Sequence, residues 1–287
     1  MTVKPVIQYV KPVIQYVRNF STMKEFLRWR SLFVRVLRSI CTVIPFSVAM
    51  RIVNVLLESQ GFGSGARIEK SGEILAARQF LSSRRRTPIT ILDIGANRGE
   101  YTEAVLKEFP DAVVHAFEPS LPTYSLLQAR VSGKKHVFLH NIALGLCEEK
   151  KFLYKENKYA RIASFTPLDV SNNEFTEEIS VYSLDQIIDA LKIDSVDLAK
   201  IDVEGHEMDV LRGAERTISD NRIKNIQFEL GGSSIDTNTT LKMFYDFLVG
   251  YNYDIFLIQP KGVKRLDSYK YGYEQYSTTN FFAALRA

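Results

Sequence analysis

The sequence predicts an α/β fold in which a mainly parallel sheet carries helices on both faces, preceded by an N-terminal helical extension. From about residue 87 onward, short apolar runs alternate with helical patterns, as in chains of this class. A glycine-containing turn at residues 95–99 follows the first run and opens a helix, as in doubly wound sheets that bind ligands. The last two apolar runs lie beyond the last strong helical pattern, which predicts a terminal hairpin.

The predicted strands and helices follow one another in order along the chain. Strands are expected at residues 89–94, 113–117, 136–142, 150–154, 196–203, 226–230, 253–258 and 281–285. Apolar residues spaced three or four apart predict helices that begin near residues 101, 121, 211 and 241. The stretch after residue 154 is predicted to be mostly loop through about residue 178.

Length and composition provide for one large domain with an extension, which we place at residues 81–287 and 1–80 of the 287. Apolar residues make up 46% and charged residues 24% of the chain, an ordinary globular composition that excludes a disordered or fibrous protein. The two cysteines, Cys41 and Cys147, have neither metal-binding nor disulfide spacing, so a reducing, cytoplasmic location is expected.

The extension is strongly basic. Residues 1–86 contain 15 lysines and arginines and 4 glutamates, a net charge of +11, whereas the remaining residues carry 22 basic and 29 acidic side chains, a net charge of −7. The heptapeptide KPVIQYV occurs in tandem at residues 4–10 and 11–17, and the proline in each copy disfavours a continuous helix. We interpret the repeat as a local duplication in an extended tail.

A basic amphipathic helix is predicted at residues 23–40. Its basic arc consists of Lys24, Arg28, Arg35 and Arg38. The helix could contact an anionic membrane surface peripherally, or its apolar face could dock on the domain or on a second subunit of a homodimer. The most apolar stretch, residues 39–57, contains a proline and an arginine and is not expected to span a membrane.

The strongest functional signal is DIGANRG at residues 93–99, between a predicted strand and a predicted helix. A backbone that passes close to a ligand at the carboxyl edge of a sheet requires Gly95 to lack a side chain, and Gly99 lets the next helix approach the sheet. Glu118 ends the second predicted strand, 23 residues after Gly95, where a carboxylate suits two ribose hydroxyls. These features predict a nucleoside-containing cofactor.

The charges of this turn favour S-adenosylmethionine over a nicotinamide dinucleotide. Asn97 occupies the position of the second glycine in the dinucleotide fingerprint, where a side chain obstructs a pyrophosphate. Asp93 would repel a phosphate. S-adenosylmethionine has no phosphate, and it carries a sulfonium and an ammonium that a nearby carboxylate favours.

A second cluster of ionisable residues lies in KIDVEGHE at residues 200–207, where a predicted strand ends and a helix begins. Asp202 and His206 are its candidates for a chemical role. Glu207 lies in the first turn of the helix, where the helix dipole favours a carboxylate, and Glu204 could cap the same helix. The cluster is expected at the same edge of the sheet as the glycine turn.

Six motifs, in this order, resemble the FkbM-type methyltransferases over about residues 88–285. They are DIGANRG (93–99), FEP (117–119), NIALG (141–145), VYSLD (181–185), KIDVEGHE (200–207) and FEL (228–230). The resemblance implies a Rossmann-like class I methyltransferase with a seven-stranded sheet and S-adenosylmethionine as cofactor. It also implies O-methylation of a hydroxyl on a sugar, glycolipid or other small-molecule acceptor. It assigns cofactor binding to Asp93, Gly95, Ala96, Asn97 and Gly99 at the methionine end, Glu118 at the ribose, and Asn141 and Ile142 at the adenine.

Removal of the acceptor proton calls for a general base. We expect His206 or Asp202 to be that base, with Glu204, the third candidate catalytic residue, and Glu229 shaping the acceptor pocket. A divalent metal ion bound by Asp202, Glu204 and Glu229 is the alternative explanation of these acids. A non-catalytic cofactor-binding protein, or a membrane-associated scaffold with this fold, is the alternative function. The acidic body and the absence of an N-P-P-[YF] motif do not favour a nucleic-acid substrate.

Overall fold

The computed structural model describes residues 31, 34–35, 44–65, 68–82, 88–160, 163, 165 and 175–286. It divides the chain into two compact units, Met1–Leu56 and Leu57–Ala287. The boundary that the sequence suggested, after residue 80, lies inside the second unit. Helix α5 (Glu73–Leu81) belongs to that unit because its buried alanines and Leu81 share an apolar cluster with the sheet.

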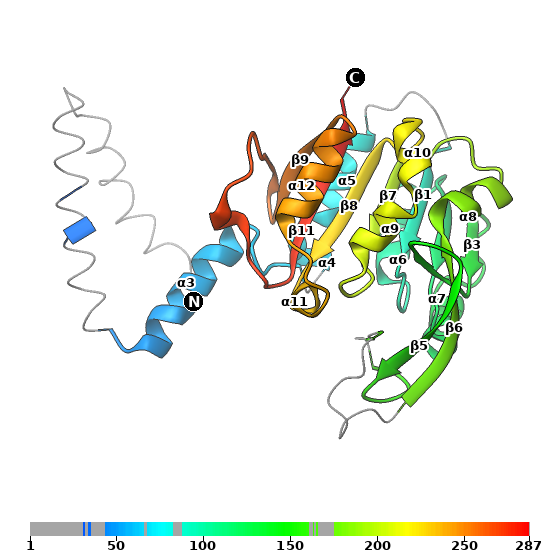
Figure 1. Ribbon diagram of the computed structural model, residues 1–287, viewed down its shortest axis with the longest axis horizontal. Coiled ribbons are helices and arrows are strands. Elements are labelled where there is room, and N and C mark those ends of the chain that lie inside the picture. Colours follow the sequence, from blue (N-terminus) through cyan, green and yellow to red (C-terminus); the bar gives the residue numbers. More distant parts are fainter. Residues whose placement is uncertain are drawn as a thin grey trace. The chain divides into compact units, whose positions relative to one another are not determined.

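The second unit is built on a sheet of eight strands in the order β10-β9-β11-β8-β7-β1-β2-β3 (Figure 1). The strands are β1 (Thr90–Ile94), β2 (Val113–Phe117), β3 (Val137–His140), β7 (Leu198–Ile201), β8 (Asn225–Leu230), β9 (Tyr253–Gln259), β10 (Gly262–Arg265) and β11 (Thr279–Leu285). Strands β3, β2, β1, β7 and β8 are parallel, whereas β11 is antiparallel to β8 and β9. The predicted fold class is confirmed, including the antiparallel pairing of the last two predicted strands.

Strand β10 is an edge strand that the sequence did not predict. It forms because β9 turns back on itself, so that Gly262 pairs with Gln259 and the two strands run antiparallel. Lys264 and Arg265 are exposed, and the other two residues of β10 are only half-buried. Such a strand leaves no apolar run in the sequence from which it could be identified.

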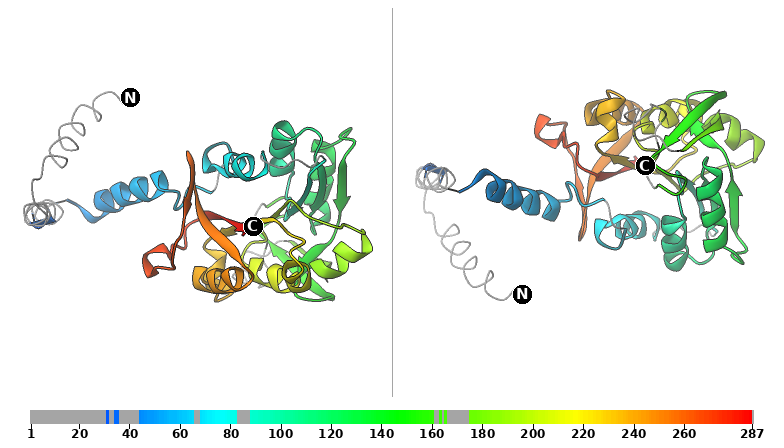
Figure 2. Two further views of the ribbon diagram at one scale, coloured as in Figure 1. Left: turned by 90° about the horizontal axis from the view of Figure 1, so that it is seen from above. Right: turned by 90° about the horizontal axis from the view of Figure 1, so that it is seen from below.

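Helices cover both faces of the sheet (Figure 2). One face carries α5, α6 (Glu100–Glu108) and α7 (Leu121–Arg130), and the other carries α8 (Leu184–Ala190), α9 (Glu207–Arg212), α10 (Glu215–Ser219) and α12 (Leu241–Gly250). Successive side chains of a strand point to opposite faces, so β1 gives Ile91 to one apolar cluster and Leu92 and Ile94 to the other. The second unit also contains the short turns α4 (Ile68–Ser71), α11 (Ser233–Asp236) and η1 (Tyr271–Tyr273).

Three further strands form a separate small sheet in the order β4-β6-β5. They are β4 (Ala143–Gly145), β5 (Glu149–Lys155) and β6 (Phe175–Ser183). Leu153, Ile179 and Val181 are buried on one face, whereas polar side chains alternate with them on the other. The predicted loop is therefore shorter than expected, because the first half of β6 has no apolar run and takes its structure from pairing with β5.

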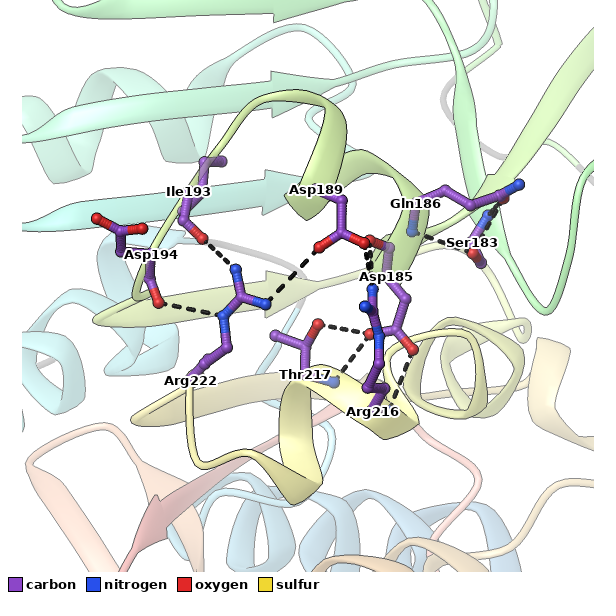
Figure 3. Close-up of polar contacts among 9 residues, drawn as sticks. All are labelled: Ser183, Asp185, Gln186, Asp189, Ile193, Asp194, Arg216, Thr217 and Arg222. Carbon is purple, nitrogen blue, oxygen red and sulfur yellow. Dashed lines mark hydrogen bonds and ion pairs between the residues drawn. The ribbon is translucent and has the colours of Figure 1, made fainter.

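Helix α8 is fixed to α10 through Asp185, the last residue of the motif VYSLD (Figure 3). Asp185 Oδ2 accepts from the backbone N–H of Arg216 at 3.1 Å, and Oδ1 accepts from the backbone N–H of Thr217 at 2.9 Å. The Thr217 hydroxyl also donates to Oδ1. The carboxylate thus satisfies N–H groups at the start of α10 that no carbonyl within the helix can reach. This part of the motif therefore has a structural role.

The described residues contain no helix that is both long and apolar enough to cross a membrane, and α3 (Phe46–Ser59) is included in that finding. The tandem repeat and most of the predicted amphipathic helix at residues 23–40 lie outside the described residues. Contact with an anionic membrane and homodimer formation therefore stay predictions.

Replacing Asp185 with alanine should lower the free energy of unfolding by about 1–2 kcal/mol, because the N–H groups at the start of α10 lose their acceptor. Chemical denaturation followed by circular dichroism measures this difference. Asp111, which is exposed, provides the control: Asp111→Ala should change stability by less than about 0.5 kcal/mol. Equal effects of the two substitutions would contradict the assigned role.

Candidate active site

A cavity lies at the carboxyl edge of the parallel strands, where β1 has β2 on one side and β7 on the other. The strand order reverses there, which is where open α/β sheets bind their ligands. The residues that line the cavity come from the ends of β1, β2 and β7 with the segments that follow them, and from the small sheet and the chain beside it. They are Ile94, Gly95, Asn97, residues 117–119, Thr123, residues 142–144, Leu153, Lys155, Ala163, Phe165, residues 202–204 and His206. The two clusters that the sequence singled out are therefore brought together in one site.

The turn after β1 leaves no space for a side chain at Gly95. The residue has a φ of +79°, and a Cβ atom there would lie 1.8 Å from the carbonyl oxygen of Asp202. The backbone N–H groups of Gly95 and Ala96 donate to the carbonyl of Phe117 at 3.0 and 2.9 Å. The chain segments after β1, β2 and β7 are thus held together by backbone contacts that only glycine permits.

Glu118 is a buried carboxylate that faces the cavity. Its Oε2 accepts from the backbone N–H of Asn97 at 3.0 Å, and its Oε1 accepts from the backbone N–H of Ser120 at 3.0 Å. Burial raises the pKa of Glu118 to about 7, although these two N–H groups act in the opposite direction. Each oxygen retains acceptor capacity for a ligand hydroxyl.

The other residues that the resemblance assigned to the cofactor fall into two groups. Gly95, Asn97 and Ile142 line the cavity with Glu118, whereas Asp93, Ala96, Gly99 and Asn141 are not part of its wall. A Cβ atom at Gly99 would lie 2.6 Å from Leu127 Cδ1. The sequence suggested that this glycine lets a helix approach the sheet, but the contact that it relieves is with α7. Asn141 donates to the carbonyls of Glu118 and Pro119 at 2.9 and 2.8 Å, which fixes the segment that carries the glutamate.

Asp93 lies beneath the turn, in a buried ionic cluster around Lys200. The Thr102 hydroxyl donates to Asp93 Oδ2 at 2.5 Å, and Lys200 Nζ lies 3.9 Å from Asp93 Oδ1 and 2.8 Å from Asp202 Oδ2. Burial acts to lower the pKa of Lys200, but the carboxylates of Asp202 and Asp93 more than offset it and hold that pKa above its ordinary value. The ammonium also lies 5.2 Å from the centre of the Tyr101 ring. Lys200 is therefore a fixed cation.

A glutamate of α5 joins this cluster, and sequence analysis did not identify it. Glu73 is 5% exposed, accepts from the Ser71 hydroxyl at 2.6 Å and accepts from Gln227 Nε2 at 2.7 Å. Gln227 in turn accepts from the Tyr101 hydroxyl at 3.2 Å. Burial raises the pKa of Glu73 to about 7. No sequence signal marks this residue, because Gln227, the partner that joins it to the cluster, lies on β8, 154 residues further along the chain.

The two candidate bases have different environments. Asp202 lines the cavity, but its Oδ2 is bonded to Lys200. His206 also lines the cavity, and its Nδ1 lies 3.1 Å from Asp209 Oδ2. The ring of Phe165 lies 4.6 Å from the imidazole and restricts its orientation. Sequence analysis did not identify Asp209, although its spacing of three residues from His206 on one helix face was a usable signal.

Two further acids, Glu204 of the second cluster and Glu229 of β8, have pKa values raised above the ordinary value of a glutamate. Burial raises the pKa of Glu204, which lines the cavity, to about 7. It raises the pKa of Glu229, which does not line the cavity, to about 10. The negative charge of Asp202 raises both pKa values further. Glu207 holds the loop, since its Oε1 accepts from the N–H groups of Val203 and Gly205 at 2.9 and 3.1 Å. Within the described parts of the chain, no three His, Cys, Asp or Glu side chains are placed to bind a metal ion. The metal alternative thus finds no support.

A family model for the methyltransferase FkbM domain matches residues 93–255, more than half of the chain. Methyltransferase 1 of Beauveria bassiana is 30% identical over 174 residues, which cover 52% of this chain and 67% of that protein. Methyltransferase sdnD of Sordaria araneosa is 27% identical over 156 residues, which cover 44% and 60%. The crystal structure of methyltransferase FkbM from Methylobacillus flagellatus is 20% identical, with a TM-score of 0.44, over 68% of this chain and 43% of that one. The chain therefore spans less than half of that solved structure.

Gly95→Ala should destabilise the protein more than Gly133→Ala, although both glycines have a φ of +79°. A Cβ atom at Gly133 meets nothing within 4 Å, so that substitution costs only the left-handed backbone conformation, about 1–2 kcal/mol. At Gly95 the overlap with the Asp202 carbonyl should add about 1–3 kcal/mol. Denaturant unfolding of both variants gives the comparison, and equal losses would show that the two chain segments separate freely.

Proposed function

Because the chain belongs to the methyltransferase FkbM family, we propose that it transfers the methyl group of S-adenosylmethionine to a hydroxyl group of a sugar, glycolipid or other small molecule. The observation that carries the proposal is the cavity at the switch in strand order, which is lined by both the Glu118 carboxylate and the oriented His206 imidazole. The carboxylate can accept hydrogen bonds from the ribose hydroxyls of a nucleoside, and the imidazole can accept the proton that an acceptor hydroxyl loses.

The residues of the cavity fit S-adenosylmethionine in charge and shape. Glu118 can accept from the ribose hydroxyls, and the apolar side chains of Phe117, Ile142 and Leu144 suit a flat adenine ring. Asp202 and Glu204, across the turn, favour the positive charges of the methionine end. When bound, the cofactor supplies a methyl group already activated by the sulfonium, so the chain has to orient the acceptor and remove its proton.

His206 is the better placed of the two candidate bases. When Nδ1–H donates to Asp209, the Nε2 atom carries no hydrogen and can accept the proton of an acceptor hydroxyl. A proton on Asp202 would instead break its bond to the buried Lys200 ammonium, and breaking such a pair costs about 3–5 kcal/mol. Asp202 therefore acts as a fixed charge, and Glu204 lies beside both in the wall.

His206→Ala should lower kcat by about 10²–10⁴-fold, because the acceptor loses its general base. Affinity for S-adenosylhomocysteine should change by less than about threefold, since the imidazole acts on the acceptor and not on the cofactor. Methyl transfer to hydroxylated glycans and titration calorimetry measure the two effects. His136, an exposed histidine, provides the control. Turnover near that of the wild type in His206→Ala would remove this residue as the base.

Affinity for S-adenosylhomocysteine should rise as the pH increases through about 7 and then level off, because only ionised Glu118 is a full acceptor for the ribose hydroxyls. The pKa of this group in the free protein is about 7, so each pH unit below that value should weaken binding by up to about tenfold. Calorimetry at several pH values tests this. Glu118→Gln should bind weakly and lose the part of this pH dependence that Glu118 contributes, whereas Glu156→Gln, at an exposed glutamate, should retain it.

A further inference from the structure

A buried lysine lies in the wall of the cavity and has no part in the function proposed above. Lys155 is the last residue of β5, is 1% exposed, and lines the cavity together with Glu118 and Thr123. Burial of an ammonium is costly unless its donors find acceptors. A cation placed beside the site of a positively charged cofactor therefore requires an explanation.

Among the described residues, the contacts of Lys155 use two of its three N–H donors. Nζ donates to Ser120 Oγ at 3.1 Å and to Thr123 Oγ1 at 2.8 Å, and an ammonium carries three donors. Both of these acceptors are neutral hydroxyls. The carboxylates of Glu118 and Glu177 act on the lysine only through their charge. Within the part of the chain that the structure describes, one donor of this buried ammonium thus meets no protein acceptor and can be given to a ligand in the cavity.

We propose that Lys155 recognises the adenine of the cofactor by donating this third N–H to a nitrogen of the purine ring. The inference rests on the proposed function, because it presupposes S-adenosylmethionine in this cavity. It assigns a cofactor-binding residue to the small sheet, and so to a part of the chain outside the glycine turn and the strand ends that flank it.

The chemistry of the ligand determines which of its ends suits a lysine. An ammonium has donors and no acceptor, so its partner must be an acceptor. The methionine end also has a carboxylate acceptor, but its ammonium and sulfonium repel a lysine, and we place that end beside Asp202 and Glu204, on the other side of β1. The ribose hydroxyls can donate to Glu118, which lines the cavity with Lys155. The ring nitrogens of adenine carry no hydrogen and act only as acceptors.

The position of Lys155 in the fold agrees with this assignment. Its partners Ser120 and Thr123 follow β2, on the same side of β1 as Glu118. Asp202 and His206 follow β7, on the other side of β1. Lys155 therefore belongs to the nucleoside side of the cavity and not to the side where the methyl group is to be transferred.

A phosphate would also suit an ammonium, but the surrounding charges disfavour it. Glu118 shares the cavity wall with Lys155, and Glu177 accepts from the backbone N–H of Leu121 at 3.2 Å while its charge acts on the same lysine. Arg98 also acts on this lysine through its charge, so the two carboxylates are matched by two cations and no excess of positive charge is left to attract an anion. A neutral acceptor such as a ring nitrogen does not depend on such an excess.

The first measurement compares the binding of S-adenosylhomocysteine to the wild type, Lys155→Met and Lys150→Met by titration calorimetry. Methionine retains the length of the side chain but cannot donate, so Lys155→Met should weaken binding by about 10–100-fold. Lys150 lies on the same strand with its side chain exposed and bonded to Glu178 at 2.7 Å, so Lys150→Met should bind as the wild type does. Thermal unfolding of each variant shows whether the fold is retained.

The second measurement identifies the contacted atom. S-adenosylhomocysteine analogues in which carbon replaces N1, N3 or N7 of the purine are titrated into the wild type and into Lys155→Met. One analogue should lose about 10–100-fold in affinity for the wild type and little further affinity for Lys155→Met, because the variant already lacks that hydrogen bond. The wild-type titrations decide the matter even if Lys155→Met does not fold.

The outcomes separate this inference from the proposed function. If the wild type binds S-adenosylhomocysteine but all three analogues bind equally well, or lose the same factor in both proteins, the assignment of Lys155 is overturned while the proposed function stands. Inorganic phosphate that binds to the wild type and not to Lys155→Met, with unchanged affinity for S-adenosylhomocysteine, would also overturn it. Failure of the wild type to bind S-adenosylhomocysteine would overturn the proposed cofactor and this inference together.

Discussion

The buried ammonium of Lys200 is the interaction on which the arrangement of this site depends. It lies opposite Asp93 in the register of β1 and β7, and it donates to Asp202 at 2.8 Å. Without it, carboxylates from two adjacent strands would face one another in a buried environment, where the loss of one partner costs about 3–5 kcal/mol. The same junction places the Asp202 carbonyl where only a glycine can occupy position 95. The ion pair of Lys200 with Asp202 and the close approach of Gly95 to the Asp202 carbonyl therefore both fix the junction of β1 and β7 at which the cavity lies.

The polar layer around Lys200 extends beyond the part of the chain that matches the family. That match begins at residue 93, yet Glu73 of α5 reaches the layer through Gln227, and burial raises the pKa of Glu73 to about 7. A carboxyl group that is partly protonated can lie near Asp93 and Asp202 at a smaller electrostatic cost than a permanent anion. Helix α5 thus has two roles in this unit, because it covers one face of the sheet with apolar side chains and completes the polar layer at its edge.

The sequence predicted the parallel strands and the centre of the site, because the signals there are local. A strand, a glycine turn and a helix follow one another within residues 90–108, and Glu118 ends the next strand. The rest depends on tertiary contacts. Lys155 ends a polar edge strand, and its role is visible only where it meets two hydroxyls of α7 and its N-cap. Asn141 follows β3 as a cofactor residue would, yet its amide donates to backbone carbonyls. The partners of Lys155 and Asn141 lie more than 20 residues away in the sequence, so the residues next to them in the chain do not predict these contacts.

The charged groups of the cavity differ between the two sides of β1, since only the side of β2 presents a cation to the ligand. After β7 lie Asp202 and Glu204, and burial raises the pKa of Glu204 to about 7. After β2 lie Glu118 and the hydroxyls that hold the Lys155 ammonium. A ligand with its positive charge at one end and neutral acceptors at the other matches this order, whereas a dinucleotide would bring a pyrophosphate next to Glu118. A cation that arrives beside Glu204 lowers the pKa of that carboxyl group, so cofactor binding and proton release are coupled at this site.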